Sequence, residues 1–249
     1  MKKIIRITTV SSSLKGLLKG QLGFMKSHYD MLGIASDENN HLKAYEEREG
    51  VRTMHVSMTR KITPFKDLIG VYQLYKIFKK EKPFIVHTHT PKAGTLGMFA
   101  AKLAGVENRL HTIAGLPLVE ITGAKRKLLN FVEKFTYSCA SMILPNSFGM
   151  KDIILEEGFC KASKLRVLGN GSSNGIDTGQ FNVDNVDNNV IKSIKEELEI
   201  SDDETIFLFI GRIVKDKGIK ELVEAFTKIS ENFGKTKLLL VGSKEDYLD

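Results

Sequence analysis

The chain has 249 residues, 42% of them hydrophobic and 27% charged, without a low-complexity tract, a composition typical of an α/β protein with one or two domains. Its formal net charge of +7 is uneven, because residues 1–182 carry 27 basic and 15 acidic side chains whereas residues 183–249 carry 10 and 15. No apolar run approaches the roughly 20 residues of a membrane-spanning helix, and neither Cys139 nor Cys160 belongs to a CxxC pair. The sequence therefore predicts a cytoplasmic protein that does not cross a bilayer.

Apolar strand-length runs and helical patterns alternate along the first part of the chain. Strands are predicted at 3–9, 32–36, 51–57, 83–88, 108–113, 141–145 and 164–168, and helices near 14–29, 66–81, 92–104, 124–138 and 147–157. This alternation is typical of a doubly wound parallel sheet, which binds ligands at the carboxyl ends of its strands. For the helix at 92–104, Thr90 and Pro91 predict the start and Gly105 the end. Its many glycines and alanines predict a close approach to the sheet.

A change of composition predicts a linker at residues 180–190. The segment QFNVDNVDNNV is rich in Asn and Asp and has no apolar periodicity. Beyond it, strands are predicted at Thr205–Ile210 and Thr236–Val241, with an amphipathic helix between them. We expect residues 1–182 to form a complete Rossmann-like domain and residues 183–249 to form an incomplete second one.

The joint between the strand at 205–210 and the following helix is a candidate phosphate-binding turn. The end of a parallel strand and the free N–H groups of a helix converge there, and the helix dipole favours an anion. Arg212 and Lys217 supply positive charge that can neutralise two phosphates without a metal ion, and Gly211 and Gly218 flank them. Taken alone, the same residues also fit an ordinary solvated turn.

Five short motifs occur along the chain in an order that resembles a known enzyme family. They are HTHTPKAG from His87, HTIAGLP from His111, PNS from Pro145, GNGSSNGID from Gly169, and Gly211-Arg212 followed after four residues by Lys217-Gly218. Together they resemble the retaining glycosyltransferases of the GT-B fold, of the group 1 or family 4 type. Within that group, the chain is most similar to bacterial enzymes that extend surface polysaccharides or lipid-linked oligosaccharides.

The resemblance implies that a sugar moves from a nucleoside diphosphate to a hydroxyl of a saccharide or lipid-linked saccharide. Arg212 and Lys217 would then hold the departing diphosphate, with no cofactor besides the sugar nucleotide. No metal is expected, since the DxD motif of metal-dependent sugar transferases is absent. In the family a later pair of glutamates, seven residues apart, also holds the donor, and this chain ends before that segment. We therefore expect a chain truncated within its donor domain and inactive by itself.

Polar residues at predicted strand ends are further candidates for the cleft. His111 and Glu120 are the candidate catalytic groups, with Glu120 as a general base for an acceptor hydroxyl. Relatives often have a histidine just before Gly115, where this chain has Ala114, so the resemblance does not by itself identify the catalytic histidine. The candidates for acceptor or cleft contacts are Ser12, Ser13, Lys15, Gly16, His87, His89, Gly115, Asn170 and Asn174.

The basic charge of the first domain predicts an anionic partner. Nucleic acid is not expected, because the chain has no aromatic residues interleaved with its basic ones, no helix-turn-helix and no zinc spacing. Residues 65–82 and 125–135 combine an apolar stripe with clustered lysines, as helices that lie on an anionic membrane surface do. Ordinary crossover helices with solvated outer faces fit the same pattern.

Two other functions also fit parts of the sequence. A nucleotide-sugar oxidoreductase with a Rossmann fold fits the alternation of elements, although no GxGxxG follows the first strand. A non-catalytic fragment that binds a saccharide or a partner subunit would bind an acceptor without turning over a donor.

Overall fold

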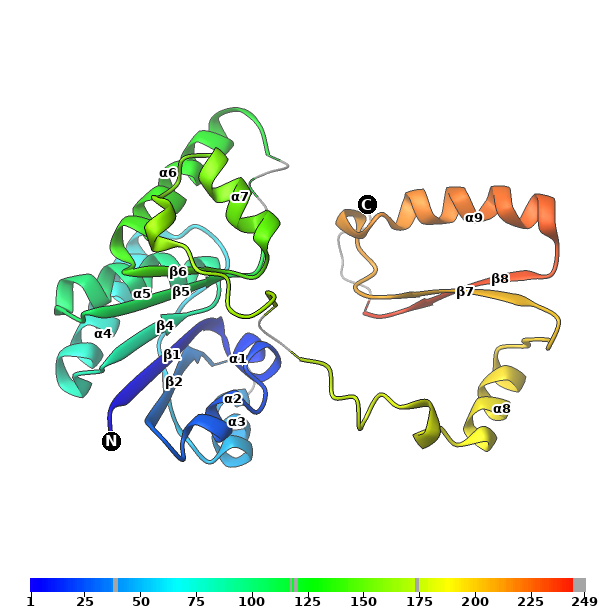
Figure 1. Cartoon of the computed structure of the whole chain (residues 1–249), viewed down its shortest axis with the longest axis horizontal. Helices are drawn as coiled ribbons and strands as arrows, with labels where there is room; N and C mark the ends of the chain where they lie inside the picture. The colour runs from blue at the N-terminus through cyan, green and yellow to red at the C-terminus, as the bar shows by residue number, and fades with distance from the viewer. Residues whose placement is uncertain (38–39, 117, 119–120, 173–174, 244–249) are drawn as a thin grey trace. The chain divides into compact units, whose positions relative to one another are not determined.

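The structure, a computed structural model of the chain, describes residues 1–37, 40–116, 118, 121–172 and 175–243. The chain divides into two compact units, Met1–Gly175 and Ile176–Asp249. Each unit is described by itself below, and both are drawn in Figure 1.

A six-stranded parallel sheet forms the centre of the first unit (Figure 1). Its elements are β1 (Lys3–Val10), α1 (Ser11–Leu17), α2 (Gln21–Met25), β2 (Asp30–Ser36), α3 (His41–Glu49), β3 (Arg52–His55), α4 (Pro64–Glu81), β4 (Ile85–Thr88), α5 (Pro91–Ala104), β5 (Asn108–Ile113), α6 (Gly123–Cys139), β6 (Met142–Pro145), α7 (Phe148–Glu156) and η2 (Ala162–Lys164). The strand order is β3-β2-β1-β4-β5-β6. Successive strands are added on one side of β1 up to β3 and on its other side from β4 onward, so the strand order reverses between β1 and β4 while all strands stay parallel. The predicted α/β class, with a doubly wound parallel sheet, is confirmed.

Helices cover both faces of this sheet, as a parallel sheet with apolar strands requires. Ile4 of β1 packs in one core with Leu14 of α1 and Tyr45 of α3. The next residue, Ile5, packs in a second core with Leu74 of α4. Successive residues of a strand point to opposite faces, so β1 contributes to both cores.

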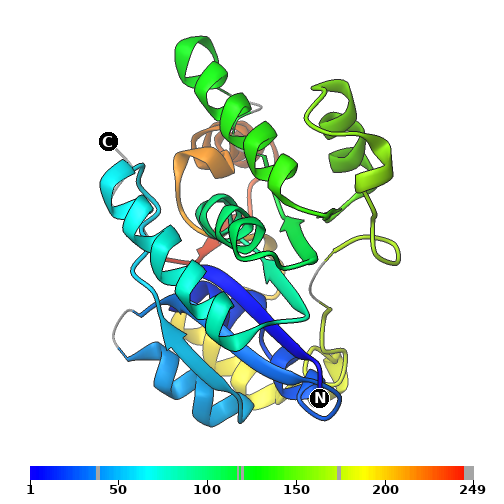
Figure 2. The same cartoon turned by 90° about the vertical axis from the view of Figure 1, so that its left-hand side faces the viewer.

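Helix α5 lies between α4 and α6 on one face of the sheet (Figure 2). A Cβ added at Gly97 would stand 2.7 Å from Cγ2 of Thr88, and one added at Gly94 would overlap the ring of His111. The predicted close approach of this helix is confirmed. Its predicted ends are confirmed too, with Pro91 in the first turn and Gly105 in the left-handed conformation, φ +79°, at the C-cap.

The second unit is smaller and contains a two-stranded parallel sheet. Its elements are η3 (Val183–Asn185), α8 (Asn188–Glu197), β7 (Thr205–Ile210), η4 (Lys215–Lys217), α9 (Ile219–Phe233) and β8 (Thr236–Val241). Helix α9 packs over the sheet, with the rings of Phe207 and Phe226 5.8 Å apart. Leu208 and Ile210 are 56% and 73% exposed, so part of the apolar sheet surface has no cover within this unit.

Two predicted elements of the first unit were wrong. The helix predicted at 14–29 is two short helices, because Gly20 adopts the left-handed conformation with φ +75° between them. The buried carboxylate of Glu49 accepts hydrogen bonds from the Gly20 and Gly23 N–H groups at the start of α2. The strand predicted at 164–168 is a single bridge between Leu165 and Ile143.

Helix α3 was not predicted, and the first unit ends earlier than the predicted boundary at residue 182. The sequence of α3, HLKAYEERE, buries only Leu42, Tyr45 and Glu49, so its apolar periodicity is weak. The first unit ends at Gly175, within the glycine-rich segment that begins at Gly169.

Candidate active site

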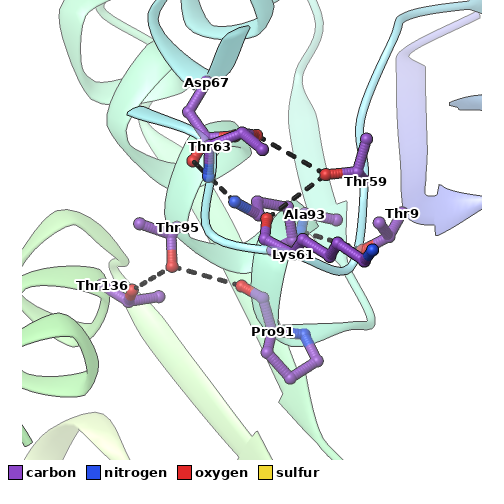
Figure 3. A network of polar contacts seen from close by, with 10 residues as sticks. Thr9, Thr59, Lys61, Thr63, Asp67, Pro91, Ala93, Thr95 and Thr136 are labelled. Atoms are coloured by element: carbon purple, nitrogen blue, oxygen red, sulfur yellow. Dashed lines mark hydrogen bonds and ion pairs between the residues drawn. The ribbon is translucent and has the colours of Figure 1, made fainter. Parts of the chain in front are cut away.

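The candidate site of the first unit lies at the carboxyl ends of β1 and β4, where the strand order reverses. The N–H group of Thr9 donates to Oγ1 of Thr90 at 2.9 Å, and the two threonine hydroxyls are 2.7 Å apart. The N–H group of Ala93 donates to Oγ1 of Thr9 at 3.3 Å (Figure 3). These bonds hold the start of α5 against the end of β1. The Thr90 side chain therefore bonds across to β1 and makes no side-chain capping bond to α5.

A second polar network holds the start of α4 beside the start of α5 (Figure 3). Oγ1 of Thr63 donates to Oδ1 of Asp67 at 2.9 Å, and Nζ of Lys92 lies 2.6 Å from Oδ2 of the same carboxylate. Both ion-pair partners are largely buried, at 13% and 19% side-chain exposure. This pair joins the first turn of α4 to the first turn of α5.

Three histidines lie buried at the ends of β4 and β5. The rings of His87 and His89 are 4.0 Å apart, and Nε2 of His87 is 2.8 Å from Oγ1 of Thr112. Nδ1 of His111 is 2.8 Å from Oγ1 of Thr88. Burial lowers the pKa of His111 to about 4, and burial lowers the pKa values of His87 and His89 well below the usual range. All three imidazoles are therefore neutral near pH 7.

A pocket of about 140 Å³ opens beside these histidines. Its lining includes Leu17, His89, Thr90, His111, Gly115 and Glu133. Burial raises the pKa of Glu133, an effect that Tyr137 partly opposes. The pocket thus combines neutral imidazoles with one carboxyl group.

The predicted cleft residues divide between this pocket and the surrounding surface. His89, His111 and Gly115 line the pocket, and the ring of His87 contacts that of His89 at a tilt of 39°. The loop residue Asn170 is exposed on the surface. Glu120 and Asn174 lie outside the described residues.

The serine-rich segment after β1 forms the first turns of the short helix α1. Ser12, Lys15 and Gly16 are exposed there, and Ser13 is half-buried. From this helix it is Leu17 that reaches the pocket. The assignment of this segment to the cleft stays a prediction.

Sequence reasoning missed Arg6, Thr9 and Glu133. Arg6 interrupts the apolar run KIIRITTV in the middle of β1, and a charge at a central strand position was the signal that could have identified it. Glu133 has no such signal, because charged residues are frequent along α6.

In the second unit, the predicted phosphate-binding residues lie on the turn between β7 and α9. Gly218 adopts φ +70° and forms the N-cap of α9, so the free N–H groups of this helix begin beside Lys217. Arg212 is half exposed, and its NH2 lies 3.5 Å from Oδ2 of Asp216. A half-exposed pair at this distance is weak.

The ends of β7 and β8 approach closely at this turn. A Cβ at Gly242 would overlap the backbone carbonyl of Gly211, and a Cβ at Gly211 would stand 3.1 Å from the Phe209 ring. The paired strand ends therefore leave no room for a side chain at Gly242, and a side chain at Gly211 would be a tight fit. Among the described residues, no group of three or more His, Cys, Asp or Glu side chains is arranged to hold a metal ion.

Two glycosyltransferases are similar to this chain over most of its length. The capsular polysaccharide biosynthesis glycosyltransferase CapM of Staphylococcus aureus is 38% identical over 98% of this chain and 62% of its own. The UDP-Gal:alpha-D-GlcNAc-diphosphoundecaprenol alpha-1,3-galactosyltransferase of Escherichia coli is 31% identical over 74% of this chain and 46% of its own. The chain thus spans less than two thirds of the length of these relatives.

A solved structure supports the fold, and two family models match the sequence. Anabaena HepE in complex with UDP matches 99% of this chain and 62% of its own with a TM-score of 0.70, at 15% identity, which supports the fold alone. Residues 190–249 match the family model described as Glycosyl transferases group 1. Residues 16–147, more than half of the chain, match the model described as Glycosyl transferase 4-like. The chain therefore belongs to the glycosyl transferase 4-like family.

Proposed function

We propose that this chain is part of a glycosyltransferase that moves a sugar from a nucleoside diphosphate to a hydroxyl of a saccharide or lipid-linked saccharide in cell-surface polysaccharide synthesis. The observation that carries the proposal is the turn between β7 and α9, where Arg212 and Lys217 lie on the segment that leads into the helix N-terminus. The names of the S. aureus and E. coli relatives support the substrate class. The UDP bound to HepE supports a nucleotide-sugar donor.

In the proposed reaction, charge builds on the diphosphate as its bond to the sugar breaks. The N–H groups of α9, the Arg212 guanidinium and the Lys217 ammonium stabilise that charge more in the transition state than in the ground state. These protein groups replace a metal ion as the counter-charge. By the family resemblance, the sugar keeps its anomeric configuration.

We also propose a peripheral contact with the anionic inner face of the cell membrane. Helix α4 exposes an apolar stripe at helical spacing: Phe65 is 85%, Leu68 63%, Ile69 58% and Tyr72 57% exposed. Lysines accompany the stripe on the same helix, which suits an anionic lipid surface. None of the helices that the structure describes is long and apolar enough to cross a membrane.

Transfer assays test the function directly. A fusion of this chain to the C-terminal remainder of the S. aureus relative would be incubated with a panel of labelled nucleotide sugars and lipid-linked saccharides. We expect multiple-turnover transfer from at least one donor, and a nicotinamide absorbance assay on the same samples to stay flat. Oxidation or reduction of the sugar nucleotide without transfer would reject the proposal.

A further inference from the structure

Arg6 is a buried cation at the reversal point of the sheet. It is 6% exposed, and its Nε–H donates to Nε2 of His89 at 2.7 Å. Its NH2 group donates to Oε1 of Gln21 at 2.9 Å, and NH1 points to the sulfur of Met25 at 3.5 Å. Burial lowers the pKa of Arg6 to about 10, so the guanidinium is charged at neutral pH. None of the described carboxylates pairs with it, so its bonds go to neutral groups.

The bond from Arg6 determines where His89 carries its proton. A neutral imidazole has one N–H and one lone pair, and Nε2 must use its lone pair to accept from Arg6. The proton then resides on Nδ1. The charged and titratable groups around this ring are Arg6, His87, His111 and Glu133, which lines the same pocket. Burial, His87, Arg6 and His111 each lower the pKa of His89. No described protein group bonds to Nδ1, and His89 lines the pocket at the ends of β4 and β5.

Glu133 of α6 lines the same pocket and supplies a hydrogen-bond acceptor. A hydroxyl donates one hydrogen bond and accepts others, so an N–H group and a carboxylate in one pocket match it. A phosphate would meet a carboxylate and neutral imidazoles, which is unfavourable. At about 140 Å³ the pocket is also smaller than the roughly 300 Å³ or more of sites that enclose a whole small ligand.

We propose that Arg6 is a positioning residue that holds the Nδ1–H tautomer of His89, and that His89 and Glu133 together bind one uncharged sugar hydroxyl of the acceptor in this pocket. The role of the hydroxyl as part of an acceptor rests on the proposed function. The pyrophosphate of a lipid-linked acceptor would then lie outside this pocket.

The tautomer is measured on the whole 249-residue chain with ¹⁵N-labelled histidine by long-range ¹H–¹⁵N correlation spectra. We expect the His89 signals, assigned with His89→Gln, to show a protonated Nδ1 and an unprotonated Nε2 at pH 7 and still at pH 6.5, the ordinary pKa of a histidine. Arg6→Met should move the proton to Nε2 in part of the population and raise the pKa of His89. Arg6→Lys keeps the charge without the directed Nε–H, so it should restore the low pKa but not the single tautomer. An Nε2–H tautomer or an imidazolium in the unmodified chain at pH 7 would overturn the positioning role.

The hydroxyl site is measured with the same signals. The chain is titrated with the methyl glycosides of glucose, galactose and N-acetylglucosamine, each up to its solubility limit. We expect at least one of them to shift the NMR signals of His89 and His111, and inorganic phosphate to leave these signals unchanged. Glu133→Leu removes the acceptor and should weaken that response about tenfold, roughly the effect of one lost hydrogen bond, whereas the exposed control Glu156→Leu should not. A response to phosphate alone, or to no glycoside, would overturn the site. A titration with UDP, followed by the amide signals of residues 211–221, tests the donor site separately. A failure of the hydroxyl site can therefore be distinguished from a failure of the proposed function.

Discussion

Arg212 carries the donor assignment at the scale of single residues. Arg212 lies on the turn that leads into α9, where a diphosphate would bind at the helix N-terminus, and its pair with Asp216 is half exposed and weak. We expect Arg212→Ala to weaken UDP binding about tenfold or more, and to cost about 2–4 kcal/mol at the transition state in an active fusion. Isothermal titration of UDP and steady-state kinetics measure the two effects. Lys228→Ala removes an exposed charge farther along α9 and is the control. Equal losses of UDP affinity in Arg212→Ala and Lys228→Ala would show that Arg212 does not bind the diphosphate specifically.

His111 makes stability depend on pH. Burial lowers its pKa from 6.5 to about 4, and unfolding restores the ordinary value. Between these pH values the unfolded chain binds more protons than the folded chain, so the free energy of unfolding rises with pH through this window. One histidine with this shift contributes about 3 kcal/mol across the window. Denaturant unfolding at a series of pH values measures the slope.

The contribution of His111 is isolated by comparing variants. His111→Gln should make the rise in unfolding free energy between pH 4 and 6.5 less steep, while the buried His87 and His89 keep their own contributions. His28→Gln, at an exposed position, is the control. Carboxylates that titrate in the same range affect all three proteins alike. A slope that is the same in the original chain and His111→Gln would show that this ring is not buried in its neutral form.

At the scale of elements, α5 approaches the sheet because it lacks side chains at Gly94 and Gly97. We expect Gly94→Ala to destabilise the chain by about 1–3 kcal/mol, because the new methyl group overlaps the His111 ring in a packed core. Gly16→Ala is the matched control, since a Cβ there meets nothing within 4 Å. It should be neutral or stabilising by up to about 1 kcal/mol. Thermal and denaturant unfolding measure both, and equal effects would contradict the close approach.

The exposed stripe of α4 is the element that we expect to touch the membrane. Phe65→Ser with Ile69→Ser should lower binding to anionic vesicles about tenfold or more, because two large apolar side chains no longer enter the lipid. Leu103→Ser, an exposed leucine of α5, is the control. Co-sedimentation should also decrease with salt, since exposed charges are screened beyond about 8 Å at physiological ionic strength. Vesicle binding that changes neither with salt nor with the two serine substitutions would reject the membrane contact.

Most of the elements follow from periodicity and turn residues in the sequence. Strand β1 and helix α5 were predicted because apolar runs, Pro91 and Gly105 are strong local signals. The break at Gly20 was missed because the apolar pattern continues through the turn that separates α1 from α2. The strand at 164–168 was wrong because an apolar run does not reveal whether a neighbouring strand is available to pair with it.

The site was less predictable than the fold. His89, His111 and Gly115 could be placed in one pocket because they lie at or just after the carboxyl ends of β4 and β5, which are neighbours in the sheet. The bond between Arg6 and His89 could not, since the two residues are 83 positions apart and meet only through the pairing of β1 with β4. Glu133 reaches the pocket through the packing of α6, which a sequence pattern does not specify.

At the scale of the whole molecule, the two units differ in how well their sheets are covered. The six-stranded sheet is packed on both faces, whereas Leu208, Ile210 and Val241 in the second unit are each more than half exposed. We expect limited proteolysis to cleave first in the exposed segment 176–187, leaving a stable fragment of the first unit. Cleavage within the first unit at equal rates would contradict this difference in stability.

The uncovered sheet also leads us to expect no multiple-turnover transfer by the 249-residue chain alone. A donor site with exposed apolar strands lacks the rigid support that catalysis requires. Product formation by the purified chain over many turnovers, measured with labelled donors and no added partner, would contradict this expectation.

The measurement that tests the donor assignment most directly is a map of backbone amide shifts of the chain during titration with UDP. We predict that millimolar UDP shifts the amides of Gly211 to Glu221, at the turn and first turn of α9, and that Arg212→Ala removes most of the response. Shifts confined to the first unit, or an unchanged map in Arg212→Ala, would contradict a nucleoside diphosphate site at this turn.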